Sequence, residues 1–173
     1  MVPGAWPGWK PGEGDKVARG ERRDVVFKPL AGMEASGPVA ASPCIFCAIA
    51  EKRAPSYVVY EDAQTLAFLD IAPLSRGHTL IIPKAHVDRI TDLPPVQYAS
   101  VLATVTEICR RMERLSRDYN IGVNQGPLAG QIVFHLHFHV IPRYPNQVGG
   151  FPRERLPLVP EEARTLLKEL GPG

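Results

Sequence analysis

Residues 134–143 read Phe-His-Leu-His-Phe-His-Val-Ile-Pro-Arg, a run in which histidine recurs at every second position. Alternate side chains of a β-strand point to opposite faces, so the histidines are expected to share one face, with neighbours about 7 Å apart. Each imidazole carries polar nitrogens that need partners, so three in a row are poor core filling. The apolar residues between them are expected to enter the core from the other face: Phe134, Leu136, Phe138 and Val140.

Three interpretations of His135, His137 and His139 compete. The run could be a hydrogen-bonded polar strand without function, a role that suits one histidine better than three in register. It could be a metal centre holding a catalytic water, although histidines on one face lie in a line instead of converging on one ion. The third interpretation is nucleophilic catalysis, in which a neutral imidazole attacks phosphorus.

The hydrophobic pattern of the remaining chain predicts one α+β domain with a mainly antiparallel sheet of five strands. A loop over residues 125–130 leads into the last strand. Short helices are expected over residues 44–50 and 161–170, and strands over residues 57–60, 65–69, 78–82, 121–124 and 132–141.

A long helix is expected in the middle of the chain. Asp92 supplies a capping acceptor, and Pro94 and Pro95 have φ already near the helical value, which predicts a helix start. Apolar residues then recur at three- and four-residue steps to about residue 118 and are expected to form one buried face. They are Val101, Leu102, Val105, Ile108, Cys109, Met112 and Leu115.

The composition limits the classes of function. A chain of 173 residues with 45% hydrophobic and 22% charged residues is typical of a soluble protein with one domain. Its net charge of +2 gives no support for a nucleic acid or an anionic membrane as partner. No apolar run approaches the roughly 18 residues of a membrane span. Three cysteines fit a reducing, cytoplasmic compartment better than a disulfide framework.

The composition also predicts three regions. Residues 1–42 are rich in Pro and Gly and lack a helix or strand period, so we predict a disordered extension that is not a signal peptide. Met33 offers an alternative start within it. Residues 43–146 are expected to form the domain, and residues 147–173 a tail that carries the short terminal helix.

Four stretches of the sequence resemble the histidine triad superfamily. Residues 135–141, His-Leu-His-Phe-His-Val-Ile, match its signature. In that signature three histidines are separated by single hydrophobic residues, and two further hydrophobic residues follow the third histidine. Asn-Gln-Gly-Pro-Leu-Ala-Gly-Gln, residues 124–131, resembles a loop of the histidine triad nucleotide-binding proteins and the fragile histidine triad hydrolases. The other two are Phe-Leu-Asp-Ile-Ala-Pro, residues 68–73, and Gly-His-Thr-Leu-Ile-Ile-Pro-Lys-Ala-His, residues 77–86.

The resemblance implies the histidine triad fold, in a homodimer, and roles for the residues of the run. His137, the middle histidine, is implied to be the nucleophile that attacks an α-phosphate, and His139 to bind phosphate oxygens and neutralise charge. Gly130 and Gln131 are implied to hold the phosphate or the leaving group, and Asn124 to contact the phosphate.

The resemblance also implies where the nucleoside binds. Asp70 is implied to accept hydrogen bonds from the ribose hydroxyls, although it could simply cap a turn. Ile132 stands where some relatives carry a serine that assists the leaving group, which puts efficient phosphoramidase activity in doubt. The apolar slot for the base, whose members could equally be core residues, is implied to be Phe46, Ile49 and Ile71.

Cys44-x-x-Cys47 has the spacing of two thiols that chelate one ion from a tight turn. A redox pair is the alternative, but no thioredoxin-like βαβ context follows. The resemblance implies that His86 and His135 complete a closed, structural zinc site. The fifth histidine, His78, could be a hydrogen-bonding support near the site or an exposed strand residue.

The resemblance therefore implies a nucleotide hydrolase or transferase that needs no redox cofactor. Its expected substrates are purine nucleotides, meaning adenylyl compounds such as dinucleoside polyphosphates or nucleoside phosphoramidates, cleaved through a nucleotidyl-His137 intermediate. One alternative is a purine-nucleotide-binding adaptor with vestigial catalysis. Another is a zinc hydrolase that uses metal-bound hydroxide.

Overall fold

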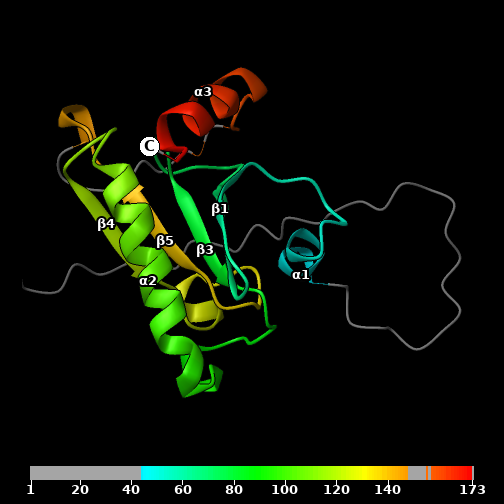
Figure 1. Ribbon diagram of the computed structural model, residues 1–173. Coiled ribbons are helices and arrows are strands. Elements are labelled where there is room, and N and C mark those ends of the chain that lie inside the picture. Colours follow the sequence, from blue (N-terminus) through cyan, green and yellow to red (C-terminus); the bar gives the residue numbers. More distant parts are fainter. Residues whose placement is uncertain (1–43, 148–154, 156, 173) are drawn as a thin grey trace, which may run out of the picture. The chain divides into compact units, whose positions relative to one another are not determined.

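The computed structural model describes residues 44–147, 155 and 157–172, so the predicted extension over residues 1–42 lies outside the described residues. The described chain contains the predicted α+β arrangement, with five strands in one antiparallel sheet (Figure 1). The α-helices are α1 (Ile45–Ala50), α2 (Pro95–Met112) and α3 (Pro160–Leu170). The strands are β1 (Val58–Glu61), β2 (Thr65–Leu69), β3 (Thr79–Pro83), β4 (Tyr119–Val123) and β5 (Phe138–Pro142).

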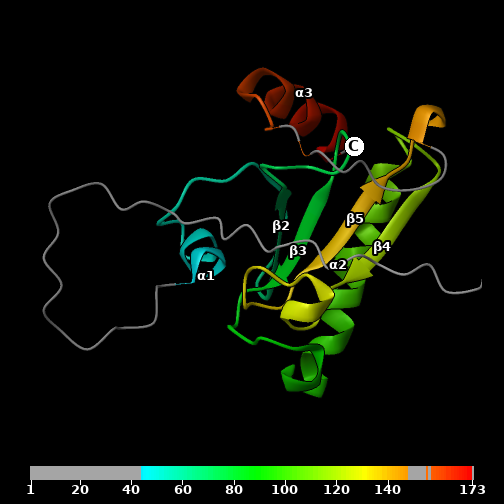
Figure 2. The ribbon, with the colours of Figure 1, turned by 180° about the vertical axis from the view of Figure 1, so that it is seen from behind.

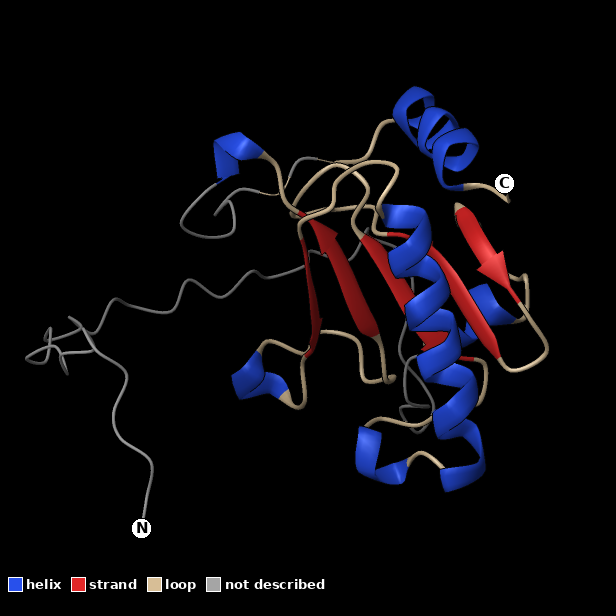
Figure 3. Ribbon diagram, turned by 60° about the vertical axis from the view of Figure 1, so that its left-hand side comes forward, coloured by secondary structure: helices blue, strands red, loops and turns tan. Residues whose placement is uncertain are grey.

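The sheet has the order β1-β2-β3-β5-β4, and its central strands are covered on both faces. Helix α2 lies along one face and contacts β2, β3 and β5 (Figure 1 and Figure 3). In the view from behind, the sheet lies in front of α2 (Figure 2). All residues of β2 and β3 are buried, which explains their near-continuous apolar sequences.

Alternation along the strands divides the core into two clusters. The larger cluster, which includes the buried residues of α2, takes Ala67, Leu69 and Ile81 from the sheet. The smaller cluster lies on the other face and consists of Phe46 from α1 with Leu66, Phe68, Leu80 and Ile82. The register pairs Leu80 with His139, so His139 lies on the face of the smaller cluster. No helix in the described part of the chain is long and apolar enough to cross a membrane.

Helix α2 differs from its prediction at both ends. Its N-cap is Pro94, and Asp92 is not the cap because it belongs to a separate 3-10 turn, Ile90–Asp92. The helix ends at Met112 and not near residue 118, because the Ser116 hydroxyl donates to the Arg143 carbonyl and accepts from the Asp118 amide. Leu102, predicted on the buried face, is 58% exposed.

The histidine run also differs from its prediction, because the last strand begins at Phe138 and not at residue 132. The Leu136 amide donates to the Val87 carbonyl at 2.6 Å, which draws this part of the chain out of the sheet ladder. Phe134 was predicted in the core and is 51% exposed, whereas Leu136, Phe138 and Val140 are buried. His135 and His137 therefore lie in irregular chain, and only His139 is on a strand.

Candidate functional site

A cavity of about 390 Å³ opens on the sheet face that carries the smaller core cluster. Its apolar wall combines α1 with that face of the sheet. Its polar wall combines the end of β2, the histidine run and a residue of the C-terminal segment. The polar side chains and the backbone lining include Ser56, Asp70, Asn124, Gly130, His137, His139 and Arg155, and the apolar lining includes Phe46, Ile49, Phe68, Ile71, Leu80, Ile132 and Val133.

His137 is held with one ring nitrogen turned toward the cavity. Its Nδ1 lies 2.6 Å from the His135 carbonyl oxygen, which only accepts, so Nδ1 carries the proton. The lone pair of the neutral ring is then on Nε2. The Phe46 ring packs edge-on against the imidazole at 5.2 Å between centroids, and burial lowers the pKa of His137. A neutral imidazole with a free Nε2 is the form that acts as a nucleophile.

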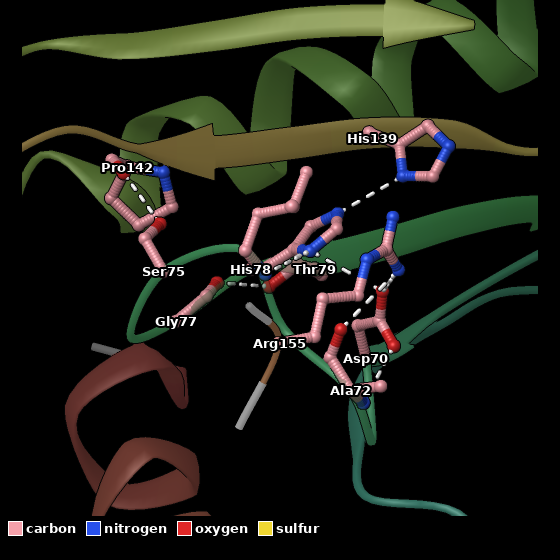
Figure 4. Close-up of polar contacts among 10 residues, drawn as sticks. Asp70, Ala72, Ser75, Gly77, His78, Thr79, His139, Pro142 and Arg155 are labelled. Atoms are coloured by element: carbon pink, nitrogen blue, oxygen red, sulfur yellow. Dashed lines mark hydrogen bonds and ion pairs between the residues drawn. The ribbon is translucent and has the colours of Figure 1, made fainter. Parts of the chain in front are cut away.

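His139 and His78 form a second pair of imidazoles beside His137. The Leu74 amide donates to His78 Nδ1 at 3.2 Å, so the proton of His78 is on Nε2, which lies 3.0 Å from His139 Nδ1 (Figure 4). His139 therefore accepts at Nδ1 and carries its own proton on Nε2. That Nε2 is buried and has no hydrogen-bond partner among the described residues. A buried N–H without a partner on a residue that lines the cavity is a candidate donor for a ligand.

Burial keeps both of these imidazoles uncharged. It lowers the pKa of His78 to about 3 and that of His139 to about 4, and the neighbouring His137 and Arg155 add to the lowering of both. His78 is buried beneath the site, which identifies it as a hydrogen-bonding support and not an exposed residue. Gly77 turns the chain ahead of it with a φ of +86°, and a Cβ there would lie 2.6 Å from Leu115 Cδ1.

Asp70 divides its two oxygens between the turn and the cavity. Oδ1 accepts from the Ala72 amide at 2.9 Å, so the residue does cap the turn after β2. Oδ2 lies 3.3 Å from His78 Nδ1 and 3.6 Å from Arg155 Nη1. Because His78 is neutral and its Nδ1 already accepts from Leu74, the charge partner of Asp70 is Arg155.

A second cluster lies at the other end of the histidine run. Cys44, Cys47, His86 and His135 each offer one ligand atom, and these atoms lie within 4.8 Å of one another. Cys44 caps α1 and Cys47 follows one turn later, so helix geometry brings the thiols together. Two thiols and two imidazoles are the donor set of a closed tetrahedral zinc site.

Hydrogen bonds around this cluster point the correct nitrogens inward. His135 Nε2 donates to the Pro83 carbonyl at 2.8 Å and His86 Nε2 lies 3.2 Å from Asp88 Oδ1, which leaves Nδ1 of both rings for a metal. His86 Nδ1 lies 3.2 Å from Cys47 Sγ. Burial and the neighbouring Cys44 raise the pKa of Cys47 to about 11, so a thiolate here needs a cation. The residues fit zinc.

The structure brings together most of the predicted site residues and one that was not predicted. Gln131 lies outside the cavity lining, because its buried amide accepts from the Gly126 amide at 2.7 Å and donates to the Asp88 carbonyl. It supports the loop that contains Gly130. Asn124 is in the lining, with Nδ2 3.5 Å from the Gly130 carbonyl. Arg155 was missed, because no motif marks it and its segment was interpreted only as a tail.

Comparisons with known proteins agree with this geometry. The family model of the HIT domain matches residues 51–146. An adenosine 5'-monophosphoramidase of Schizosaccharomyces pombe is 38% identical over 74% of this chain and 96% of its own length. An adenylylsulfatase of Arabidopsis thaliana is 41% identical over 58% of this chain and 52% of its own length. A zinc-bound histidine triad family protein from Mycobacterium smegmatis superposes with a TM-score of 0.64 at 40% identity, over 74% of this chain and 93% of that one.

The fold and the histidine cluster therefore define the class, and the chain belongs to the histidine triad (HIT) family. Two of its similar relatives carry the names of hydrolases that act on adenylyl compounds. Membership of the family supports an enzyme that hydrolyses nucleotides.

Proposed function

We propose that this protein is a nucleotide hydrolase or transferase that cleaves adenylyl compounds at the α-phosphate through a nucleotidyl-His137 intermediate. The observation that carries the proposal is the free Nε2 of a neutral His137 in a cavity that also contains the Asp70 carboxylate. The names of two relatives, an adenosine 5'-monophosphoramidase and an adenylylsulfatase, support the adenylyl group as the common part of the substrate. Dinucleoside polyphosphates and nucleoside phosphoramidates are the two candidate classes.

The side chains of the cavity suit the parts of a nucleotide. The base would enter the apolar wall, where Phe46, Ile49 and Ile71 lie, and the ribose hydroxyls would donate to Asp70. Asn124 and the backbone of Gly130 also line the cavity and would contact the phosphate. Ile132 lies at the mouth with 81% of its surface exposed and has no polar atom for a leaving group.

The proposed reaction has two steps. The Nε2 lone pair of His137 attacks the α-phosphorus, and the P–N bond forms as the bond to the leaving group breaks and that group departs with the electron pair. Water then attacks phosphorus and loses a proton to solvent, the P–N electron pair returns to Nε2, and the nucleoside monophosphate leaves. The Nε2 proton of His139 would donate to a phosphate oxygen in both steps, which stabilises the charge that develops there.

We also propose that Cys44, Cys47, His86 and His135 hold a structural zinc. A bound zinc would cross-link α1 to the segment before β5 and so fix the backbone carbonyl of His135. That carbonyl orients His137, so the metal cluster would act on catalysis by positioning. The zinc-bound neighbour from Mycobacterium smegmatis supports this proposal.

A homodimer is the assembly that the surface favours, in the cytoplasm as the cysteine content suggests. Helix α2 exposes apolar residues beside a second cavity of about 390 Å³, and β4 is an edge strand of the sheet. Light scattering of the wild type and of Leu102→Lys tests this, with a dimer expected for the first and a monomer for the second. The exposed residues of α2 are Val96, Tyr98 and Leu102.

The proposed function is tested by comparing the wild type with His137→Asn on a dinucleoside polyphosphate and on an adenosine phosphoramidate. Loss of the nucleophile is expected to lower turnover of whichever compound is cleaved by at least about a thousandfold. Adenosine monophosphate is expected to bind both proteins with similar affinity, because the apolar wall and Asp70 remain. Unchanged turnover would contradict the mechanism, and binding without turnover in the wild type would favour a nucleotide-binding adaptor.

A further inference from the structure

Arg155 enters the cavity from a part of the chain that follows the family match, which ends at residue 146. This C-terminal segment is attached next to Asp70. The Leu158 amide donates to the Ile71 carbonyl at 2.9 Å, and Arg155 Nη1 donates to the Ala72 carbonyl at 3.3 Å. Arg155 is therefore held by the same turn that presents Asp70.

Helix α3 fixes the far end of the segment. Leu166 and Leu170 are fully buried in the larger core cluster. Arg111 donates to the Leu170 carbonyl at 3.3 Å, and Arg76 pairs with Glu169 at 2.7 Å. Residues 158–170 thus pack on the domain, and Arg155 lies three residues before them at the cavity.

The guanidinium group lies between the two ends of the candidate site. Figure 4 shows it in the space between the Asp70 carboxylate and the ring of His139. The distance from Arg155 Nη1 to Asp70 Oδ2 is 3.6 Å. Its charge also acts on His139 and His78, since it contributes to the lowered pKa of each. Its charge therefore reaches the imidazole that carries the unpartnered Nε2.

A phosphate that binds in the cavity needs a positively charged partner, and the charges around the cavity limit the choice. Asp70 and Arg155 are the only Asp, Glu, Lys or Arg side chains in the lining formed by the described residues. A nucleotide phosphate that entered a cavity with Asp70 alone would meet a net negative charge, while His139 is neutral and offers a single donor. Arginine presents several N–H donors in a fork that matches phosphate oxygens, and its charge would reverse that balance.

We propose that Arg155 is the phosphate-binding cation of the nucleotide site and exchanges Asp70 for the α-phosphate when a nucleotide binds. The proposal rests on the proposed function. When a nucleotide binds, Asp70 would give up its ion pair with the guanidinium and accept from the ribose hydroxyls. The guanidinium would then donate to phosphate oxygens beside His139. The side chain is long enough to serve both because it already lies between them, and 41% of it is exposed to solvent.

The proposal predicts that loss of the Arg155 charge weakens the binding of a nucleotide but not that of a nucleoside. Arg155→Gln removes the charge and keeps a polar side chain of similar reach. We expect it to weaken the binding of adenosine monophosphate about 10- to 100-fold, the effect of losing hydrogen bonds to a charged group. Binding of adenosine, which has no phosphate, is expected to stay the same or to tighten, because Asp70 loses its competing partner. Isothermal titration with both ligands measures the difference.

Two further variants serve as controls. Arg164→Gln makes the same change at an exposed arginine of α3 that pairs with Glu161, and it is expected to change neither affinity. Arg155→Lys keeps the charge without the fork, so it should restore part of the lost affinity. The kcat/KM for a cleavable adenylyl substrate is expected to fall with Arg155→Gln by at least as much as the affinity for adenosine monophosphate.

The alternatives give different results in the same titrations. Tighter binding of both ligands to Arg155→Gln would overturn the proposal and make Arg155 a plug that blocks the ribose site. Equal weakening of both would also overturn it and assign Arg155 a structural role. Unchanged binding of adenosine monophosphate would remove Arg155 from the site and leave the proposed function intact. A wild-type protein that binds neither ligand would contradict the proposed function itself.

Discussion

His135 and His137 are two residues apart, yet they present opposite ring nitrogens to two different sites. His135 donates Nε2–H to the Pro83 carbonyl and turns Nδ1 toward the two cysteines. His137 donates Nδ1–H to the His135 carbonyl and has Nε2 free for the cavity. One backbone carbonyl in each case decides the tautomer and therefore the chemistry.

The comparison also shows how the two sites are coupled. The carbonyl that orients His137 belongs to His135, the residue proposed as a zinc ligand. A rigid cluster at one end of the run therefore sets the geometry of the nucleophile at the other end. The metal region is expected to control stability, and the cavity region turnover, which the following predictions test from the largest effect to the smallest.

The largest expected effect on stability comes from the metal cluster. Cys47→Ser removes one of four ligands, and the free energy of unfolding is expected to fall by about 4 kcal/mol if free zinc exceeds its dissociation constant by a thousandfold. Urea unfolding with zinc content measured on the same samples checks this.

A chelator gives the complementary result. It should lower the unfolding midpoint of the wild type and leave that of Cys47→Ser unchanged. Turnover at low temperature, where the metal-free protein is still folded, is expected to survive chelation within about tenfold if zinc only positions His137. Complete and immediate loss of turnover in a protein that remains folded would instead indicate metal-bound hydroxide.

The second expected effect is a difference in stability loss between the buried and the exposed side of the irregular segment before β5. Leu136 is fully buried and Phe134 is half exposed, although the sequence predicts both in the core. Leu136→Ala is expected to cost about 3 kcal/mol of unfolding free energy, and Phe134→Ala less than about 1 kcal/mol. Thermal or urea unfolding of the two variants measures the difference. Similar losses would mean that the segment is a regular strand after all.

The third effect concerns the pH dependence of stability. The pKa of His78 is about 3 and that of His139 about 4 in the folded chain, below the ordinary histidine value of 6.5. The unfolded chain therefore takes up protons first as the pH falls. The contribution of these groups is present above pH 6.5. It is lost as the pH falls to about 4 for His139 and to about 3 for His78, at an expected slope of about 1 kcal/mol per pH unit for each group.

His78→Gln measures this slope. It removes one titrating group and retains a side chain that donates a hydrogen bond to His139. Zinc-loaded wild type and variant are compared by urea unfolding between pH 6.5 and pH 5, and the variant should show the shallower slope. Parallel slopes would show that His78 is charged or exposed in the folded protein.

Sequence patterns predicted those features that depend on local spacing. The fully buried β2 was predicted with its observed bounds, and the two cysteines one helical turn apart already indicated a shared ion. The other two ligands, His86 and His135, came from the family resemblance and not from spacing, and the four ligand atoms lie together in the structure.

Features that depend on distant contacts were not predictable in this way. The Leu136 amide bonds to Val87 ahead of β5, and the Ser116 hydroxyl bonds to Arg143 just after α2. Period counting therefore starts the strand too early and ends the helix too late. Arg155 reaches the cavity through long-range contacts of its segment with the turn after β2 and through the packing of α3, and no sequence motif marks these contacts.

The central claim is tested most directly by intact-protein mass spectrometry after rapid mixing with an adenylyl substrate and a quench that avoids acid. The wild type is expected to show a transient gain of one adenylyl group, and His137→Ala is expected to show none. Consumption of substrate by the wild type without any adduct, under conditions in which a slowly hydrolysed analogue also gives none, would contradict a nucleotidyl-histidine intermediate.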